Sequence, residues 1–202
     1  MQEAGEIVRK CYGCQMFATK PHTPASELKT IPLAWPFAQW GLDMVGPLKK
    51  SSRGGHTHLL VAVDKFTKWI EPVPITSSTA TTAVNFIRTI IFRFGVPHSI
   101  ITDNGINFTA DEFKEFCAEQ GIKLNYASVA HPQSNGQVEK ANGLVCRGLK
   151  KRLLTPLKRA AGAWVEELPS VLWSLRTTPN RSTQYIHFFM VYGAEAVLPY
   201  DL

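Results

Sequence analysis

The chain has 202 residues, of which 45% are apolar, so it is long enough for one sizeable globular domain with a modest appendage. Its cysteines, Cys11, Cys14, Cys117 and Cys146, are too few for a disulfide framework, no apolar run reaches membrane-span length, and the N-terminus lacks a secretory signal. We therefore expect an intracellular, non-membrane protein, and the net charge of +6 favours a polyanionic partner.

The first 38 residues predict an appendage and a connector. Residues 1–20 contain Cys11 and Cys14, whose spacing is that of half a zinc site. Residues 21–38 carry Pro21, Pro24, Pro32 and Pro36, and proline at this density prevents helix and favours an extended linker. We place a domain boundary at the end of this segment.

Three strands are predicted next, from apolar runs that are separated by polar or turn-forming residues. The runs are Trp40–Val45, His58–Asp64 and Trp69–Pro74. The middle run is continuously apolar, which is typical of a strand buried on both faces. The short spacing between the three runs predicts an antiparallel meander.

Helices and strands then alternate. Apolar residues from Ala83 to Phe94 follow helical spacing, with Ser78 or Thr79 as the N-cap and Gly95 as the stop. The following elements are a strand, a helix and a strand, at Ser99–Thr102, Ala110–Gln120 and Ile122–Tyr126. This order predicts a mixed sheet covered by helices, which belongs to the α/β class.

The last third of the chain is predicted to be helical. Residues 127–137 are rich in Ser, Pro, Asn and Gly and should form a mobile loop. A long helix should follow to about Leu154, then an amphipathic helix over Ala163–Arg176. The tail is predicted to be mostly loop, with one helical turn near Phe188–Tyr192.

Three carboxylates stand out as candidate metal ligands. Asp43 lies within the first strand, Asp103 follows the fourth strand at an Asn-Gly turn, and Glu139 lies near the start of the long helix. Carboxylates on strand ends and a nearby helix can converge on hard cations such as Mg²⁺. A pair of such ions can activate an attacking oxygen and stabilise a leaving one in phosphodiester chemistry.

Each of these acids also has an ordinary explanation. A strand-end Asp before Asn-Gly is commonly a turn former, and a Glu in the first turns of a helix commonly interacts with the helix dipole. Taken alone, each acid has a chance of about one in ten of being a functional residue, because short motifs often match by chance. Together with their flanking residues, the three acids make a much stronger signal.

With these flanking residues the chain resembles the integrases of gypsy-type long-terminal-repeat retrotransposons, within the retroviral-integrase and DDE-transposase superfamily. The resemblance covers nearly the whole chain from Cys11 to about Pro199. Its most specific parts are Trp40-Gly-Leu-Asp-Met-Val-Gly-Pro47, Val63-Asp-Lys-Phe-Thr-Lys-Trp69, Ile101-Thr-Asp-Asn-Gly105 and His131-Pro-Gln-Ser-Asn-Gly-Gln-Val-Glu139.

The resemblance implies an RNase H-like core of five strands flanked by helices, over residues 39–178. It implies that Asp43, Asp103 and Glu139 are the catalytic and metal-binding triad for two Mg²⁺ or Mn²⁺ ions. Asp43 and Asp103 would bind the shared metal, and Glu139 would complete the second site. The implied activity is removal of terminal nucleotides from element DNA and joining of the 3′-hydroxyl ends to target DNA.

The cysteine pair is an incomplete zinc site. The family carries a His-His-Cys-Cys module before the core, but no histidine precedes Cys11 here. We therefore interpret residues 1–20 as the remnant of an N-terminal zinc-binding module and expect no bound Zn²⁺. Residues 179–202 are interpreted as a C-terminal extension that stops before any C-terminal domain, so the chain is expected to be a fragment of a polyprotein.

DNA contacts are predicted from the loop and from the basic helix. Asn135 and Gln137 would shape the loop and meet DNA near the scissile phosphate. From Lys140 to Val165 there are seven basic residues and no acidic one, which is unlike the mixed charges of a solvated helix face. We expect phosphate contacts from Lys140, Arg147, Lys150 and Lys151, without readout of sequence. Gly143 stands where relatives often have a basic residue.

The implied partners are element-end DNA, target DNA and further copies of the chain in a homo-oligomer. The implied location is the nucleus, by way of cytoplasmic particles. One alternative is a folded but inactive nucleic-acid-binding relic. It is favoured by Gly143 and by Gln184–Phe189, which depart from the pattern usual in relatives. Another is an RNase H-like nuclease of repair or RNA turnover, against which the His131–Glu139 motif argues.

Overall fold

The structure is a computed structural model that describes residues 35–127, 136–154, 161–180 and 183–197. The chain divides into two units at Pro32, and all described residues belong to the second, Leu33–Leu202. The predictions made for Cys11, Cys14 and Asn135 lie outside the described residues, as does most of the predicted linker. The side chains of Gln137, Lys150 and Lys151 are likewise outside the description.

A five-stranded mixed sheet organises the fold, in the order β3-β2-β1-β4-β5. β1 pairs antiparallel with β2, and β2 pairs antiparallel with β3, which confirms the predicted meander. β4 runs parallel to β1, and β5 runs parallel to β4. The strands are β1 Gln39–Val45, β2 His58–Asp64, β3 Ile70–Ile75, β4 Ser99–Thr102 and β5 Lys123–Tyr126.

Five helices lie close to their predicted positions, at α3 Ala80–Phe94, α5 Asp111–Glu119, α6 Gly136–Leu154, α7 Trp164–Arg176 and α8 His187–Tyr192. A further short helix, α4, spans Ile106–Thr109. A 3-10 turn, η3 at Ala161–Ala163, precedes α7. Thr79 caps α3 by accepting a hydrogen bond from the Thr82 backbone N–H at 3.2 Å. Gly95 ends α3 with a positive φ of 86°, which glycine adopts without steric cost. The α/β class and the mixed five-stranded sheet are confirmed.

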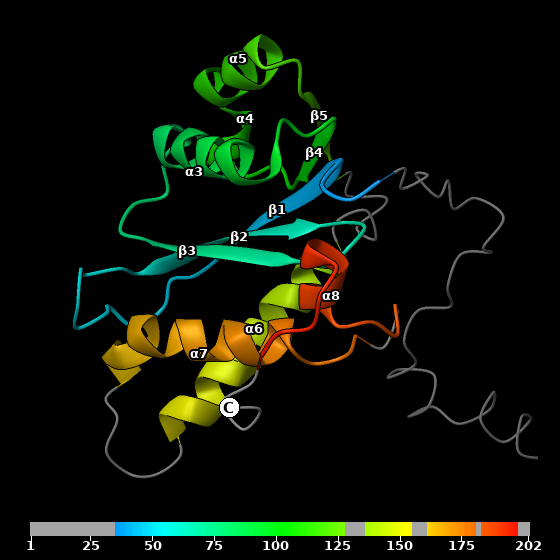
Figure 1. The fold of residues 1–202 in the computed structure, drawn as a ribbon. Helices are drawn as coiled ribbons and strands as arrows, with labels where there is room; N and C mark the ends of the chain where they lie inside the picture. The colour runs from blue at the N-terminus through cyan, green and yellow to red at the C-terminus, as the bar shows by residue number, and fades with distance from the viewer. Residues whose placement is uncertain (1–34, 128–135, 155–160, 181–182, 198–202) are drawn as a thin grey trace, which may run out of the picture. The chain divides into compact units, whose positions relative to one another are not determined.

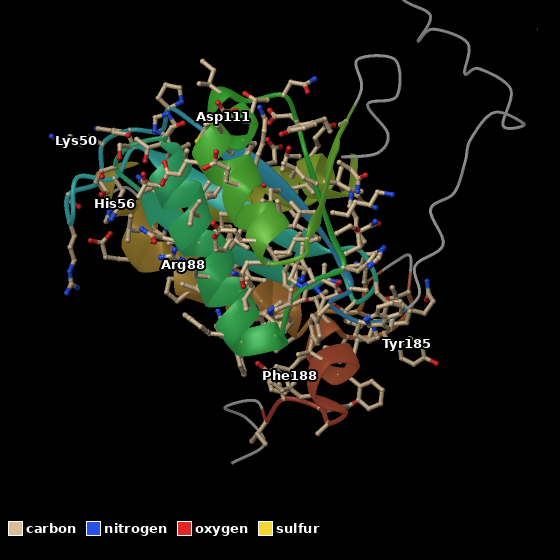
Figure 2. All side chains as sticks on the ribbon, turned by 90° about the horizontal axis from the view of Figure 1, so that it is seen from above. Lys50, His56, Arg88, Asp111, Tyr185 and Phe188 are labelled. Carbon is tan, nitrogen blue, oxygen red and sulfur yellow. The ribbon has the colours of Figure 1, made fainter. Side chains whose placement is uncertain are left out.

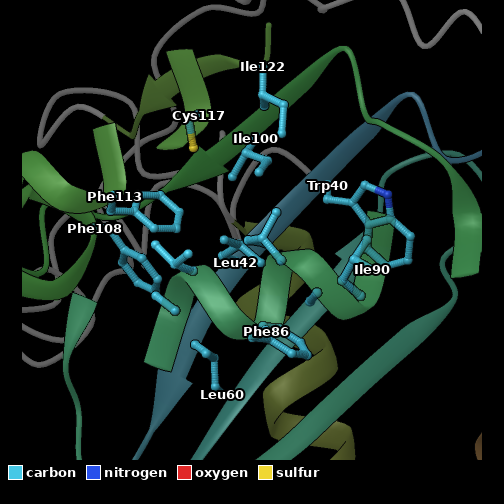
Figure 3. Packing of buried hydrophobic residues seen from close by; sticks show 14 of the residues in the cluster. Trp40, Leu42, Leu60, Phe86, Ile90, Ile100, Phe108, Phe113, Cys117 and Ile122 are labelled. Carbon is cyan, nitrogen blue, oxygen red and sulfur yellow. The ribbon is translucent and has the colours of Figure 1, made fainter. Parts of the chain in front are cut away.

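One face of the sheet is covered by α3, α4 and α5 (Figure 1). Trp40 and Leu42 of β1 and Leu60 of β2 point to this side, where they meet aromatic residues of the helices (Figure 3). Phe108 and Phe113 pack edge-on at 5.6 Å between ring centroids and are almost completely buried. This cluster is the larger apolar core and stabilises the fold mainly by removing aromatic and aliphatic surface from water.

The opposite face is covered by α6 and α7 (Figure 1). Here β2 contributes Leu59, Val61 and Val63, which alternate with the residues that face α3. The buried residues of α6 recur at helical spacing and form one stripe toward the sheet, at Val138, Ala141, Val145 and Leu149. The continuously apolar pattern of β2 is therefore explained by burial on both faces.

Local differences from the sequence predictions have tertiary or capping causes. The short helix α4 was not predicted, because four residues leave no periodic pattern. Gly136 and Gln137, predicted as loop, begin α6 instead. Residues 35–38 belong to the predicted linker, yet Ala38 is buried in the core and Phe37 stacks on Trp40.

The predicted C-terminal extension also joins the core. Phe188 of α8 packs against the first apolar cluster, whereas Tyr185, just before the helix, is exposed (Figure 2). Trp69 meets Tyr192 edge-on, with 5.7 Å between the ring centroids. Among the described residues, no helix combines the length and apolar character needed to cross a bilayer.

Candidate active site

Asp43 lies on the α6 side of the central strand. Side chains alternate along a strand, so Gly41 and Asp43 face α6 while Trp40 and Leu42 face α3. The antiparallel register places Asp43 opposite Val61 of β2. Asp43 therefore lies at the edge of the apolar cluster between the sheet and α6, and its side chain is partly buried.

Gly41 allows α6 to approach β1 closely. A Cβ atom at this position would overlap the Val138 side chain of α6 and lie 2.9 Å from Cε of Lys65. Val138 is fully buried and directly precedes Glu139. The missing side chain at Gly41 is thus what lets the helix that carries Glu139 rest on the strand that carries Asp43.

The carboxylate of Asp43 is held by two hydrogen bonds. Oδ1 accepts from the backbone N–H of Met44 and Oδ2 accepts from Nδ2 of Asn142 on α6, both at 2.7 Å. Burial is the main cause that raises the pKa of Asp43, and the negative charges of Asp103 and Glu139 raise it further. The two hydrogen bonds favour the ionised form and oppose this shift.

Asp103 follows β4 at the carboxyl end of a strand that is parallel to β1. The register pairs Gly41 of β1 with Ile101 of β4. Both strands therefore run in the same direction toward their aspartates, which lie at the same edge of the sheet. Oδ1 of Asp103 accepts a hydrogen bond from the Gly105 backbone N–H at 3.1 Å. Asp103 thus stabilises the turn after β4, which is the ordinary role of an Asp before Asn-Gly. Its exposed carboxylate also acts electrostatically on Asp43.

Glu139 lies in the first turn of α6 and is exposed. Its charge acts on both Asp43 and Lys65. Fold and register thus bring the three predicted acids into one electrostatic neighbourhood. Within the described ranges, however, no group of three or more His, Cys, Asp or Glu side chains is arranged to hold a metal ion.

The carboxylate oxygens of the three acids are ligands that suit Mg²⁺ or Mn²⁺. The three acids are not spaced so that they enclose an ion by themselves. Mg²⁺ prefers oxygen ligands and is usually bound by one or two carboxylates together with waters and substrate phosphates. Asp43 and Asp103 at one sheet edge, with Glu139 on the adjacent helix, supply such oxygens. The three negative charges repel one another, and this repulsion adds to burial, the main cause, in raising the pKa of Asp43.

Lys65 is a buried cation beside this site that was not predicted from the sequence. It is 3% exposed, and its Nζ lies 3.2 Å from the place that a Cβ atom at Gly41 would occupy. The pKa of Lys65 is lowered to about 8, mainly by burial and also by the positive charge of Lys68, while attraction to Glu139 opposes both effects. The available signal was a lysine that directly follows Asp64, at the end of the apolar run of β2.

Asn142 is a second residue that was missed. Its Nδ2 donates to Asp43, while its Oδ1 is buried without a hydrogen-bond partner. Glu139 and Asn142 are three residues apart on α6, so they lie on neighbouring positions of the helix surface. That spacing was the available signal, because a polar residue one turn after a candidate ligand can orient the site.

The predicted DNA-binding residues of α6 lie away from the apolar stripe. Lys140 and Arg147 are both exposed. The Arg147 guanidinium folds back over Gly143, with Nη1 3.3 Å from where a Cβ atom would be. Arg147 therefore brings positive charge to the position at which the sequence lacks a basic residue.

Asp64, a further acid at the end of β2, has a structural role. Its Oδ2 accepts hydrogen bonds from both the backbone N–H and the hydroxyl of Thr67 at 2.7 Å. Its Oδ1 accepts from the Phe37 backbone N–H at 3.0 Å. The carboxylate is completely buried and fastens the β2–β3 turn to the segment before β1.

The amino-acid sequence is similar to that of known proteins. Residues 35–132 match the Integrase core domain family. The chain is 31% identical over 205 residues to the Pro-Pol polyprotein of simian foamy virus type 3, a match that covers 96% of this chain and 16% of that protein. It is 30% identical over 201 residues to the transposon Tf2-3 polyprotein of Schizosaccharomyces pombe, covering 98% of this chain and 15% of that protein.

A solved structure has the same fold. The HTLV-2 integrase catalytic core domain, determined in complex with magnesium in a trimeric form, superposes with a TM-score of 0.60 at 24% identity, covering 77% of this chain and 97% of that one. The RNase H-like fold is thereby confirmed. The chain spans about a sixth of the polyproteins that it matches. It belongs to the integrase core family shared by retroviruses and retrotransposons.

Proposed function

We propose that this chain is the catalytic core of a gypsy-type retrotransposon integrase, a divalent-metal-dependent polynucleotidyl transferase. It would remove terminal nucleotides from element DNA and join the 3′-hydroxyl ends to target DNA in the nucleus. The observation that carries the proposal is the electrostatic coupling of Asp43 with both Asp103 and Glu139. These are the acids that the family resemblance assigns to the triad.

In this proposal Asp43, Asp103 and Glu139 would hold two Mg²⁺ or Mn²⁺ ions. Bound ions supply activation of the attacking oxygen and charge stabilisation at the leaving oxygen. Asn142 orients Asp43 through its amide, and Lys65 supplies a positive charge near Glu139. Lys140 and Arg147, which are exposed on α6, would bind DNA phosphates.

The active form is proposed to contain several copies of the chain. The magnesium-bound HTLV-2 core is described as a trimer, which supports assembly in this family. The DNA partners, element ends and target, are proposed on the same family basis together with the net charge of +6.

The test is a strand-transfer or disintegration assay with Mn²⁺ on the native chain and on Asp103→Asn. Replacing one carboxylate ligand should lower the rate by about 100-fold or more, because metal-assisted charge stabilisation is worth several kcal/mol. The matched control is Asp111→Asn, since Asp111 is also exposed but pairs with Lys114 on α5. The control variant should retain native activity.

A second candidate is a nucleic-acid-binding relic that has lost catalysis. The observation that favours it is the lack, within the described residues, of a three-ligand metal group. It predicts that the native chain and Asp103→Asn give equal signals in the assay while both bind DNA. That result would remove the transferase proposal.

A further inference from the structure

A pocket with a mainly apolar wall and a few polar groups lies near the candidate active site, and of its lining residues only Lys140 has a role in the proposed function. It has a volume of about 220 Å³ and is lined by residues of the β2–β3 connection, of α6 and of the segment that leads into α8. Val63 and Leu144 belong to its apolar lining. Its polar lining consists of Lys68, Lys140, Asn180 and His187.

His187 lines this pocket and carries a buried N–H donor that has no partner among the described residues. The side chain is 4% exposed, and its Nε2 lies 2.7 Å from Nδ2 of Asn180. An amide nitrogen can only donate, so Nε2 is the acceptor and the neutral ring carries its proton on Nδ1. Nδ1 is buried and has no hydrogen-bond partner within the part of the chain that the structure describes. A buried donor without an acceptor is costly, and an oxygen ligand in the pocket would remove that cost.

Positive charge is concentrated around the same pocket. Lys68 is partly buried, and its ammonium group donates to the backbone carbonyl of Lys65. Burial lowers the pKa of Lys68 most, the attraction of Asp64 raises it, and the positive charge of Lys140 lowers it. Burial, then the charges of Lys68 and Arg176, lowers the pKa of His187, which keeps its ring neutral. An anion between the two ammonium groups would offset their repulsion.

We propose that this pocket binds a phosphate group of a nucleic-acid backbone. Lys68 and Lys140 would supply the charge, and the Nδ1–H of His187 would supply a directed hydrogen bond to a phosphate oxygen. Lys140 directly follows Glu139, so the pocket adjoins the edge at which the scissile phosphodiester is proposed to lie. The assignment to DNA rests on the proposed function, whereas the phosphate chemistry rests on the pocket alone.

The first test observes His187 directly. The full chain, labelled with ¹⁵N-histidine, is titrated without divalent metal with inorganic phosphate in one series and with a hairpin DNA duplex in another. His187 signals are assigned by comparison with His187→Gln. Both ligands are expected to shift the Nδ1 resonance, and Asp103→Asn should give the same shifts, so that loss of catalysis is separable from loss of the pocket.

The second test removes the charge of Lys68 without disturbing the backbone. Lys68 has a positive φ of 63°, a conformation that asparagine tolerates well, so Lys68→Asn should fold. Its DNA affinity should fall by about tenfold, and the slope of log affinity against log salt should drop by about 0.9, the value for one lost phosphate contact. The matched control Lys123→Asn changes an exposed lysine on β5 and should leave the affinity unchanged within about twofold.

The outcomes decide the proposal. Shifts of His187 by both ligands that disappear in Lys68→Asn support it. Shifts by inorganic phosphate without shifts by DNA would overturn the assignment to nucleic acid. If neither ligand moves the His187 resonance, or if Lys68→Asn and Lys123→Asn bind DNA equally, the pocket is not a phosphate site and the proposal is wrong.

Discussion

The two faces of β1 differ in what they contribute to the protein. Trp40 and Leu42 point toward α3 and are completely buried among aromatic and aliphatic side chains. Gly41 and Asp43 point toward α6, where a missing side chain and a partly buried charge take their place. One strand thus stabilises the fold with alternate residues and builds the candidate site with those between them.

The side of β1 that faces α6 stabilises the fold less than the other side, because it holds charged groups that the candidate site needs. The pKa of Asp43 is raised, mainly by burial, and that of Lys65 is lowered, mainly by burial, so both groups are ionised at some cost in free energy. Asn142 leaves its Oδ1 without a partner on the same face. On the α3 face, Trp40 and Leu42 belong to an apolar cluster, and the buried Glu71 of the neighbouring β3 is paired with Arg93 of α3.

The largest effect on stability is expected on the α3 face. Leu42→Ala should lower the free energy of unfolding by about 2–5 kcal/mol, because it removes a completely buried side chain and leaves a cavity. Urea unfolding followed by circular dichroism measures it. The comparison between the two faces fails if Leu42→Ala costs less than the Gly41→Ala change next to it.

A change of opposite sign is expected for Lys65→Met on the site face. The unfolded chain keeps the ammonium proton up to the ordinary pKa of 10.5, whereas the folded chain releases it near 8. Between these values the folded chain binds fewer protons, so its stability rises with pH, and below pH 8 burial of the charge is destabilising. Lys65→Met should raise the free energy of unfolding at pH 7 by about 3 kcal/mol.

The measurement for Lys65→Met is urea unfolding of both proteins in metal-free buffer from pH 7 to pH 10.5. The difference between them should shrink as pH rises through this window. A constant difference across the window would show that packing, and not charge burial, separates the two proteins. We also expect slower strand transfer by Lys65→Met, since Glu139 loses a neighbouring positive charge.

Gly41→Ala tests whether close approach of α6 positions Glu139. The added methyl group overlaps Val138 and must push the helix outward, at a cost of about 1–3 kcal/mol. Strand transfer should fall more than DNA binding does, because the phosphate contacts of α6 move together with the helix. Gly143→Ala is the control, since its added Cβ meets only the flexible Arg147 guanidinium. Equal losses of activity in both variants would contradict this role for Gly41.

The smallest effect on stability is expected for Asn142→Ala. The change removes a charge-assisted hydrogen bond to Asp43, worth about 1.5–3 kcal/mol, and also removes a buried, unpartnered oxygen. The two contributions oppose each other, so the free energy of unfolding should change by about 1 kcal/mol or less. Strand transfer should nevertheless decrease, because Asp43 loses the group that orients Oδ2. Unaltered activity would show that Met44 alone is enough to orient Asp43.

Much of the fold was predictable because its signals are local. The continuous apolar run at His58–Asp64, the Thr79 cap and the Gly95 stop each depend on a few neighbouring residues, and each prediction agrees with the structure. The helix α4 was missed because four residues show no period. Phe37 and Ala38 were assigned to the linker because prolines dominate the segment, whereas Phe37 contacts Trp40 and Asp64 and Ala38 is buried in the core.

The amino-acid sequence by itself determined the class of the fold, the order of its elements and the three acids worth testing. Only the tertiary structure decided that Gly41 admits α6, that Asn142 holds Asp43 and that Lys65 lies buried beside them. The physical reason is the distance along the chain between the groups that interact. Helix periodicity, capping and turns depend on neighbours in the chain, whereas burial and charge coupling depend on groups that register and helix packing bring together from distant positions.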